Sequence, residues 1–355
     1  MTLNQRIESL AILGAFLGQF SEQQAQKKTG ITGNDTFFEV FKTTCESAQY
    51  KNGWFTPKEV ARAMESWSKA LTEKELKKWV SNYDIPEQQT QERKDIAIIT
   101  AGNIPLVGLH DIVAVLITGN NAHIKTSSKS ANLEKSVCQY LCEISPEWRN
   151  RIVFHENRIE NFDKIIATGS NNTARYFEHY FKNKESLIRK NRNSVAVLTG
   201  AETSEELEAL GKDIFTYFGL GCRSVSKIYI PKNYKLDTFF EHIVAYSDII
   251  NTSKYANNYD YNKAVYLMSL IKVYDNNFIT LKPEDKQLSS PVGCLFYEYY
   301  EDREVLKTKL ETLSEQLQCV VNFPENPKHV PFGHTQDPKL MDYADGADTI
   351  KFLLQ

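Results

Sequence analysis

Between residues 94 and 199, short apolar runs alternate with longer segments in which apolar side chains recur at helical spacing. Five of the apolar runs have the length of β-strands, and they span residues 95–100, 122–126, 151–154, 164–168 and 194–198. The helical segments between them span residues 106–118, 131–144 and 173–181. Strands that alternate with helices predict βαβ units and a mostly parallel sheet. We therefore predict an α/β fold, with ligands bound where the strands end.

One of these strand ends is followed by a glycine and a run of small polar residues. Thr168 closes the strand, and Gly169 and Ser170 lead into a helix that starts near Thr173. Backbone N–H groups at the start of a helix bind phosphate, and a glycine lets a ligand approach the backbone. The segment indicates a phosphate site, although an ordinary helix cap would use the same residues.

The strand at residues 122–126 ends in basic and hydroxyl side chains. Lys125 and Ser127 lie there, and no Asp or Glu occurs between His123 and Leu133. In a dinucleotide-binding sheet, a carboxylate at this place favours the 2′-hydroxyl of NAD, whereas cationic groups suit the 2′-phosphate of NADP. The segment favours NADP, although taken alone it also fits a solvated charged turn.

Asn103 follows the first strand and stands just before Ile104 and Pro105. A side-chain amide on a fixed turn can donate a hydrogen bond to a developing oxyanion. Asn and Pro are also common in turns that carry no chemistry, so this residue alone does not decide between the two interpretations.

One of the six cysteines, Cys222, follows two glycines and precedes two basic residues. Gly219 and Gly221 allow a backbone that other residues resist, and they leave the thiol without bulky near neighbours. Arg223 and Lys227 add positive charge, which favours the thiolate. We predict a reactive thiol. The alternative is a buried structural cysteine, which is the usual place of an isolated intracellular cysteine.

The remaining segments carry weaker signals. Residues 1–90 show apolar side chains at helical spacing and predict a helical region. Residues 251–261 are polar and rich in Asn and Tyr, which favours a long surface loop. His334 stands in a turn-rich tail, and its role is left open.

Composition and charge exclude several classes of function. A hydrophobic content of 41% and a charged content of 25% are typical of a globular protein. A net charge of -3 implies no general affinity for nucleic acid, and no apolar run approaches the length of a membrane span. The six cysteines are scattered, so we expect neither a disulfide framework nor a metal site. We expect a cytoplasmic protein.

The span from about residue 94 to the C-terminus resembles the LuxC-type acyl-CoA reductases, a divergent branch of the aldehyde dehydrogenase superfamily. The resemblance rests on six blocks in the right order, which are residues 102–111, 124–129, 167–177, 189–198, the Cys222 turn, and the tail segments 330–333 and 342–346. It implies an aldehyde dehydrogenase-like α/β fold. The expected parts are a helical N-terminal region packing on the next domain (1–93), a Rossmann-type NADP-binding domain (94–199), a catalytic domain carrying Cys222 (200–329) and a C-terminal segment returning to the substrate mouth (330–355).

The resemblance also implies roles for single residues. Cys222 matches the catalytic thiol of the superfamily, and Asn103 matches its oxyanion-hole asparagine. The positions implied to hold the cofactor are Lys125 and Ser127 at the adenosine ribose, and Gly169 and Ser170, preceded by Thr168, at the pyrophosphate. The Pro331-Phe332-Gly333 segment resembles a late turn near the substrate mouth.

Two departures from the superfamily pattern bear on the reaction. Arg192-Asn193-Ser194 stands where oxidising aldehyde dehydrogenases carry the glutamate that activates water. Without that base an acyl-enzyme thioester would persist. The segment that starts at Gln287 replaces the glutamate that contacts the nicotinamide ribose, which puts that contact in doubt.

We therefore expect an enzyme that uses NADPH to reduce fatty acyl-CoA or acyl-carrier thioesters to aldehydes through an acyl group on Cys222. The long acyl chain is implied by the resemblance alone, as is association into a homo-oligomer or an acyl-transfer complex. Two alternatives stay open. One is a non-catalytic partner that kept the fold, and the other is a cysteine acyltransferase or thioesterase that needs no nucleotide.

Overall fold

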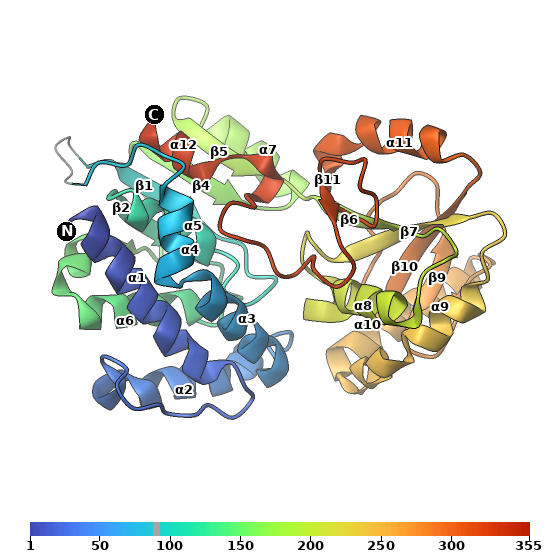
Figure 1. Cartoon of the computed structure of the whole chain (residues 1–355), viewed down its shortest axis with the longest axis horizontal. Helices are drawn as coiled ribbons and strands as arrows, with labels where there is room; N and C mark the ends of the chain where they lie inside the picture. The colour runs from blue at the N-terminus through green and yellow to red at the C-terminus, as the bar shows by residue number, and fades with distance from the viewer. Residues whose placement is uncertain (88–92) are drawn as a thin grey trace. The chain divides into compact units, whose positions relative to one another are not determined.

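The computed structural model describes residues 1–87 and 93–355 and divides the chain into two compact units (Figure 1). The first unit contains Met1–Lys190 and Lys339–Gln355, and the second contains Asn191–Pro338. The chain thus changes unit at Lys190, whereas the sequence suggested a boundary near residue 199. Residues 88–92, which end the predicted helical region, lie outside the described residues.

The first unit opens with four helices, which are α1 (Leu3–Leu17), α2 (Asn34–Lys51), α3 (Pro57–Ala70) and α4 (Glu73–Val80). Three of them begin at a threonine whose side chain accepts a backbone N–H of the first turn, namely Thr2, Thr56 and Thr72. The predicted helical region is therefore confirmed for these four helices, whereas residues 21–33 and 81–87 form turns and irregular segments.

A five-stranded parallel sheet follows in the first unit, with the strand order β3-β2-β1-β4-β5. The strands are β1 (Asp95–Ile99), β2 (Asn121–Lys125), β3 (Ile152–Phe154), β4 (Lys164–Thr168) and β5 (Glu185–Arg189). The helices that connect them are α5 (Leu109–Ile117), α6 (Leu133–Ile144) and α7 (Asn171–Tyr180). This strand order is that of a dinucleotide-binding sheet, which confirms the predicted fold class.

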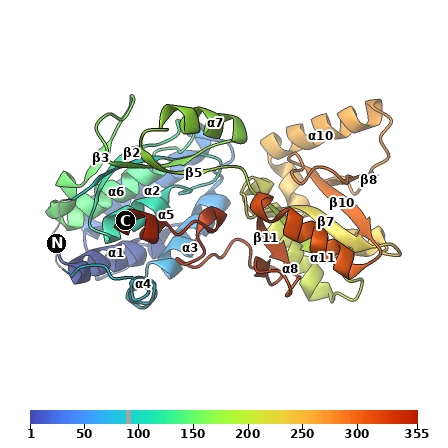
Figure 2. The same ribbon diagram turned by 90° about the horizontal axis from the view of Figure 1, so that it is seen from above.

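The two faces of this sheet are covered by different elements (Figure 2). Ile96, Ile98 and Ile124 face the core built with α1, α5 and α6. Ala97 and Ile165 face the other side, where α7 and the segment after β3 cover the sheet. The short helix α12 (Thr349–Leu354) brings the C-terminus back to the first of these cores.

One predicted strand belongs elsewhere. The run at residues 194–198 forms β6 (Asn193–Val197), which lies in the sheet of the second unit. The fifth strand of the first sheet is β5, whose residues Glu185 and Ser186 are exposed. An edge strand with this little apolar content leaves no clear pattern in the sequence.

The second unit is built on a seven-stranded sheet with the order β12-β11-β6-β7-β10-β9-β8, in which only the β8–β9 pair is antiparallel. Besides β6, its strands are β7 (Val225–Pro231), β8 (Tyr274–Asp275), β9 (Thr280–Pro283), β10 (Cys294–Tyr300), β11 (Leu317–Val321) and β12 (His329–Val330). Its helices are α8 (Ser204–Phe215), α9 (Leu236–His242), α10 (Ser253–Met268) and α11 (Arg303–Thr312).

The prediction of a surface loop at residues 251–261 is wrong, because most of this segment lies in α10. The side chains that α10 buries are Tyr255, Tyr259 and Tyr266. Tyr255 donates its hydroxyl to the Phe278 carbonyl, and Tyr259 donates to Asp275. A helix whose buried face consists of hydrogen-bonded tyrosines does not show the aliphatic spacing by which helices are usually found.

Candidate functional site

The carboxyl ends of β1, β2 and β4 meet at one edge of the first unit's sheet, since the strands are parallel neighbours. The strand order reverses between β1 and β4, and this is where open α/β sheets bind nucleotides. The structure thereby brings to one edge the predicted residues that end or follow these strands, which are Asn103, Lys125, Ser127, Thr168, Gly169 and Ser170.

The turns after β1 and β2 are packed directly against each other. A Cβ placed on Gly102 would lie 2.8 Å from both Cβ and Oγ of Ser127, so no larger residue fits there. Asn52, which caps the end of α2, donates to the carbonyl oxygens of Gly102 at 3.3 Å and Lys129 at 2.9 Å. Packing and this amide fix the turn on which the exposed Asn103 lies.

Ser170 is the N-cap of α7. Its Oγ accepts the backbone N–H of Thr173 at 3.2 Å and lies 2.9 Å from the Thr173 hydroxyl. Gly169 packs against the same threonine, since an added Cβ would fall 2.9 Å from Thr173 Cβ. The helix-cap interpretation of this segment is therefore confirmed. It is compatible with phosphate binding, because a capped helix start at a strand end still presents the positive end of the helix dipole.

Cys222 lies in the second unit, in the turn between α8 and β7, and its side chain is exposed. The chain leaves α8 through three successive left-handed residues, Tyr217 (φ 53°), Phe218 (φ 57°) and Gly219 (φ 74°). The two aromatic side chains are buried, which holds this unusual backbone in place. The turn reverses the chain and leaves the thiol at the surface of the unit.

Ser194 ties the cysteine turn to the neighbouring strands. Its buried hydroxyl donates to the Cys222 carbonyl at 3.0 Å and accepts the Cys319 N–H at 3.1 Å. Ser194 ends the Arg192-Asn193-Ser194 segment, which the resemblance matched to the superfamily's water-activating glutamate. The segment therefore contacts the cysteine turn and contains no carboxylate.

The cysteine turn is also hydrogen-bonded to the segment that starts at Pro331-Phe332-Gly333. Arg223 donates its Nε–H to the Thr335 carbonyl, and Gln336 donates to the Ser224 hydroxyl at 3.2 Å. Asp213 of α8 accepts the N–H groups of Gly333 at 2.7 Å and Thr335 at 3.0 Å, and the Thr335 hydroxyl at 2.8 Å. The segment thus lies beside the turn that carries Cys222.

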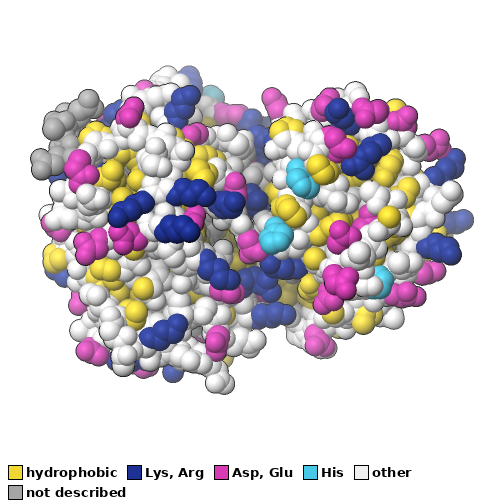
Figure 3. All heavy atoms as spheres, in the orientation of Figure 1, with side chains coloured by type: hydrophobic (Ala, Val, Ile, Leu, Met, Phe, Trp, Pro, Cys, Tyr) yellow, Lys and Arg dark blue, Asp and Glu magenta, His cyan; other side chains and the backbone are white. Residues whose placement is uncertain are grey.

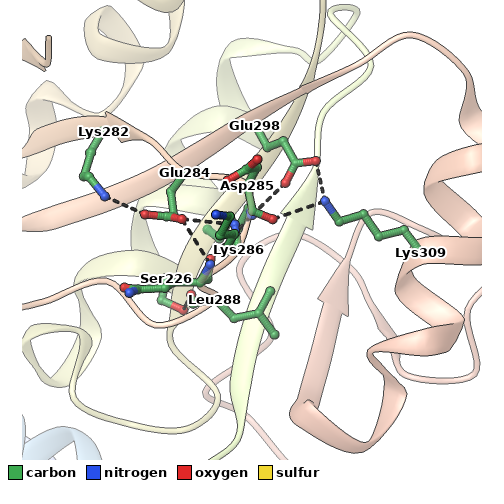
Figure 4. A network of polar contacts seen from close by, with 10 residues as sticks. Ser226, Lys282, Glu284, Asp285, Lys286, Leu288, Glu298 and Lys309 are labelled. Carbon is green, nitrogen blue, oxygen red and sulfur yellow. Dashed lines mark hydrogen bonds and ion pairs between the residues drawn. The ribbon is translucent and has the colours of Figure 1, made fainter. Parts of the chain in front are cut away.

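The expectation that Lys227 adds positive charge near the thiol is wrong. Its side chain is 1% exposed, and its ammonium group donates to Glu298 at 2.7 Å and to the Gln287 carbonyl at 3.4 Å. Lys309 binds the other oxygen of Glu298 within the same polar network (Figure 4). Burial lowers the pKa of Lys227. Lys227 is therefore buried and paired with Glu298, and Arg223 is the basic side chain with a hydrogen bond at the cysteine turn.

The segment around Gln287 is held in a fixed conformation. Glu284 accepts the N–H groups of Lys286 at 3.0 Å and Gln287 at 3.2 Å, and Ser226 donates to the Leu288 carbonyl at 2.7 Å (Figure 4). The hydrogen bond from Lys282 lowers the pKa of Glu284 to about 2, so this carboxylate stays charged. The Gln287 side chain is exposed.

Several partners of the cysteine turn could not be found from the sequence. Asp213 and Thr335 show no local motif, Ser194 was singled out only as part of the Arg192-Asn193-Ser194 segment, and Thr335 is 112 residues from Arg223 along the chain. The predicted Asn103 and Cys222 belong to different units, so their cooperation stays a prediction. His334 precedes Thr335, and its ring lies 4.0 Å from Asp337.

The described residues contain no cluster of three or more His, Cys, Asp or Glu side chains that could hold a metal ion. Within residues 1–87 and 93–355, none of the helices combines the length and the apolar character that crossing a membrane requires. Basic and acidic side chains are interspersed on the visible surface of each unit (Figure 3).

Comparison with known proteins agrees with this architecture. The family model described as Acyl-CoA reductase (LuxC) matches residues 54–247. Aldehyde dehydrogenase 21 from Physcomitrella patens, solved with its product succinate, is similar with a TM-score of 0.65 and 13% identity over 100% of this chain and 84% of the other. An oxidoreductase from Marinobacter aquaeolei gives a TM-score of 0.65 at 12% identity over 96% and 79%.

A Bacillus cereus aldehyde dehydrogenase solved as its NAD+ complex gives a TM-score of 0.60 at 12% identity, covering 92% of this chain and 73% of the other. At such low identity these likenesses establish the fold and nothing finer. No curated protein matches the sequence.

Proposed function

Because the chain belongs to the LuxC acyl-CoA reductase family, we propose that it reduces long-chain fatty acyl thioesters to aldehydes with NADPH, through an acyl group carried on Cys222. The observation that carries this proposal is the exposed thiol of Cys222, which lies on a turn fixed from two sides and contacted by a segment without a carboxylate.

The first unit fits a dinucleotide. Its strand order and the capped start of α7 at the strand edge suit a pyrophosphate, and Gly102 lets the β1 and β2 turns pack closely beneath it. Gly169, Ser170 and Thr168 would hold the pyrophosphate, and Lys125 and Ser127 the adenosine ribose. When bound, NADPH supplies the hydride that converts the acyl group to the aldehyde.

In the acylation step, the Cys222 thiolate attacks the thioester carbonyl, and the new S–C bond replaces the bond to the departing thiol. The sulfur of coenzyme A or of a carrier protein leaves as a thiolate and then takes up a proton. The Asn103 amide and the Cys222 backbone N–H would stabilise the oxyanion that forms on the way. Loss of one such donor typically lowers a rate by about a hundredfold or more.

The acyl group must then survive long enough to be reduced. Ser194 lies in the segment that contacts the cysteine turn, and its hydroxyl already donates a hydrogen bond to the Cys222 carbonyl, so it does not act as a base for water. Asp213 is buried and accepts three hydrogen bonds, so it is not placed to activate water. A thioester without a neighbouring base hydrolyses slowly, which favours reduction over release of free acid.

Two other functions would give different results with acyl-CoA and NADPH. A non-catalytic partner would bind nucleotide or acyl thioester without consuming either. A cysteine acyltransferase or thioesterase would turn over acyl-CoA with no need for NADPH. Following absorbance at the nicotinamide band with a panel of acyl-CoAs distinguishes the reductase from both.

The decisive test is the location of the acyl group. After incubation with acyl-CoA and no NADPH, mass spectrometry should find the acyl group on Cys222, and Cys222→Ala should abolish both the adduct and the reduction while NADPH binding is retained. Cys142→Ala is the matched control, since this half-buried thiol lies in the first unit. An adduct on another cysteine, or full reduction by Cys222→Ala, contradicts the proposal.

A further inference from the structure

Two histidines lie next to Lys125 at the edge of the first unit's sheet. His123 and Lys125 are two residues apart on β2 and therefore point to the same face. The register pairs Ile124 with Phe154, which places His155 across from Lys125 at the carboxyl end of β3. The backbone N–H of His155 donates to the Ile124 carbonyl at 2.8 Å, so its position relative to β2 is fixed.

The two imidazoles form a chain that starts at an aspartate. His123 Nε2 lies 3.3 Å from Asp95 Oδ1, and His123 Nδ1 lies 3.0 Å from His155 Nε2. A carboxylate can only accept, so His123 carries its proton on Nε2 and its Nδ1 accepts the Nε2–H of His155. The basic nitrogen of His155 is then Nδ1, which is left to take up a proton toward a ligand.

The charges around His155 favour an anion. Lys125 forms no ion pair within residues 1–87 and 93–355, and no carboxylate contributes to the shift of the His155 pKa. Burial lowers this pKa first, and the His123 ring lowers it further. The charged and titratable groups on the neighbouring elements are His123 and Lys125 of β2, Asp95 of β1, Glu156, Arg158 and Glu160 of the segment after β3, and Arg175, Tyr176, Glu178, His179 and Tyr180 of α7.

We propose that His155 and Lys125 together bind a phosphate monoester on the adenosine ribose of the bound nucleotide, namely the 2′-phosphate of NADPH. The end of the second strand faces this ribose in sheets of this strand order. His155 would be a specificity-determining residue that prefers the phosphorylated cofactor. The inference rests on the proposed function, because it assumes that the first unit binds a dinucleotide.

The proposal predicts proton uptake when NADPH binds. A phosphate dianion next to Nδ1 favours the protonated imidazole and raises its pKa, so the complex holds more protons than the unbound protein. Affinity for NADPH therefore increases as the pH falls from 8.5 to 6.5. NADH carries no phosphate at this place, so its affinity stays constant over the same range.

The test measures dissociation constants of NADPH and NADH by nucleotide fluorescence at pH 8.5 and 6.5. Wild type should bind NADPH roughly three- to fivefold more tightly at pH 6.5, as expected when one charge-assisted hydrogen bond forms on protonation. His155→Gln should lose this gain and keep its affinity for NADH. His179→Gln is the matched control, since this exposed histidine lies on α7, and it should behave like wild type.

Competition with nucleotide fragments separates two sources of the phosphate. Adenosine 2′,5′-bisphosphate should displace NADPH, and should do so more strongly at pH 6.5 in wild type but not in His155→Gln. Adenosine 3′,5′-bisphosphate carries the phosphate of coenzyme A, and stronger competition by it would overturn the assignment to NADPH. The same holds if His155→Gln keeps the full pH dependence.

The experiment also distinguishes this inference from the proposed function. If NADPH binds more tightly than NADH but His155→Gln changes neither affinity nor pH dependence, the inference fails and the reductase proposal stands. If neither cofactor binds wild type at any pH, the cofactor assignment itself fails.

Discussion

Glycines shape the turn after β1 in the first unit and the cysteine turn in the second, but for different physical reasons. Gly102 is required by close packing, because a Cβ would lie 2.8 Å from the Ser127 side chain. Gly219 is required by backbone conformation, with φ at +74° and the nearest atom to an added Cβ at 3.3 Å. The turn after β1 therefore depends on close packing, and the cysteine turn depends on a left-handed backbone conformation.

A buried carboxyl group lies next to each of these turns, and the two are satisfied to very different degrees. Both oxygens of Glu134, in the first turn of α6, lack a hydrogen bond of good geometry, although they face the Gly108 N–H and the Ser130 hydroxyl. Asp213 accepts three hydrogen bonds from Gly333 and Thr335. Burial raises the pKa of both groups, and that of Glu134 to about 7.

The difference determines how each unit responds to change. In the second unit, the directional hydrogen bonds that Asp213 accepts hold a segment that is 120 residues away in the chain, so single polar substitutions should have large effects. In the first unit, packing holds the turn and a buried carboxyl group is left poorly satisfied, so pH should matter more.

The largest effect is expected from Asp213→Ala. Removing the carboxylate leaves the N–H groups of Gly333 and Thr335 buried without an acceptor, which costs on the order of 3–5 kcal/mol of unfolding free energy in total. Thr335 would also lose its fixed position, and with it the Arg223 contact beside Cys222. Urea denaturation measures the first effect, and the rate of Cys222 alkylation by iodoacetamide measures the second.

Asp337→Ala is the control for this variant. Asp337 forms an ion pair with Lys212 at 2.7 Å, but its side chain is half exposed. Such a surface pair is worth at most about 1 kcal/mol. Equal losses of stability in the two variants would show that the buried hydrogen bonds of Asp213 are not what holds the segment.

Glu134→Gln should show the next largest effect, which should grow as the pH rises from 4.5 to about 7. The pKa of Glu134 rises from 4.5 to about 7 on folding, so the stability contributed by the protonated carboxyl group is fully present below pH 4.5. That contribution is lost as the pH rises through 7. Glutamine does not titrate, so the variant should gain on the order of 2–3 kcal/mol relative to wild type between pH 5 and 8.

Thermal or urea unfolding of both proteins across this range measures the difference. Glu143→Gln, on the exposed side of the same helix, should give no such trend. A constant difference between wild type and Glu134→Gln at all pH values would mean that the carboxyl group titrates equally in the folded and unfolded states.

The sequence predicts the sheet of the first unit well, because most of its strands are buried on both faces. Ile96, Ile98 and Ile166 belong to apolar runs that only a central strand produces. The two elements that the sequence did not predict, β5 and α10, lack such apolar runs. β5 begins with two exposed polar residues, and the buried face of α10 is made of tyrosines, so neither shows the aliphatic pattern of its element.

The candidate site divides in the same way. Cys222 and Gly169 stand in short local motifs, and these can be found without a structure. Asp213 and Ser194 act through partners 122 and 125 residues away, and no local pattern announces such a contact. The prediction for Lys227 was wrong for the same reason, since this buried side chain pairs with Glu298, 71 residues further on.

The smallest effect on stability is expected from alanine substitutions at Gly219 and Gly221, the two glycines of the cysteine turn. Gly219→Ala forces a side chain into the left-handed region and should cost about 1–2 kcal/mol of unfolding free energy. Gly221 has no positive φ, and an added Cβ would lie at an ordinary 3.4 Å from Ser224 Oγ, so Gly221→Ala should cost much less. Urea denaturation of both variants gives the stabilities, and iodoacetamide alkylation shows whether Cys222 keeps its reactivity. If the strained backbone serves to present the thiol, Gly219→Ala should slow alkylation while Gly221→Ala leaves it nearly unchanged; the reverse order would mean that open space around Gly221, rather than the left-handed turn, makes the thiol reactive.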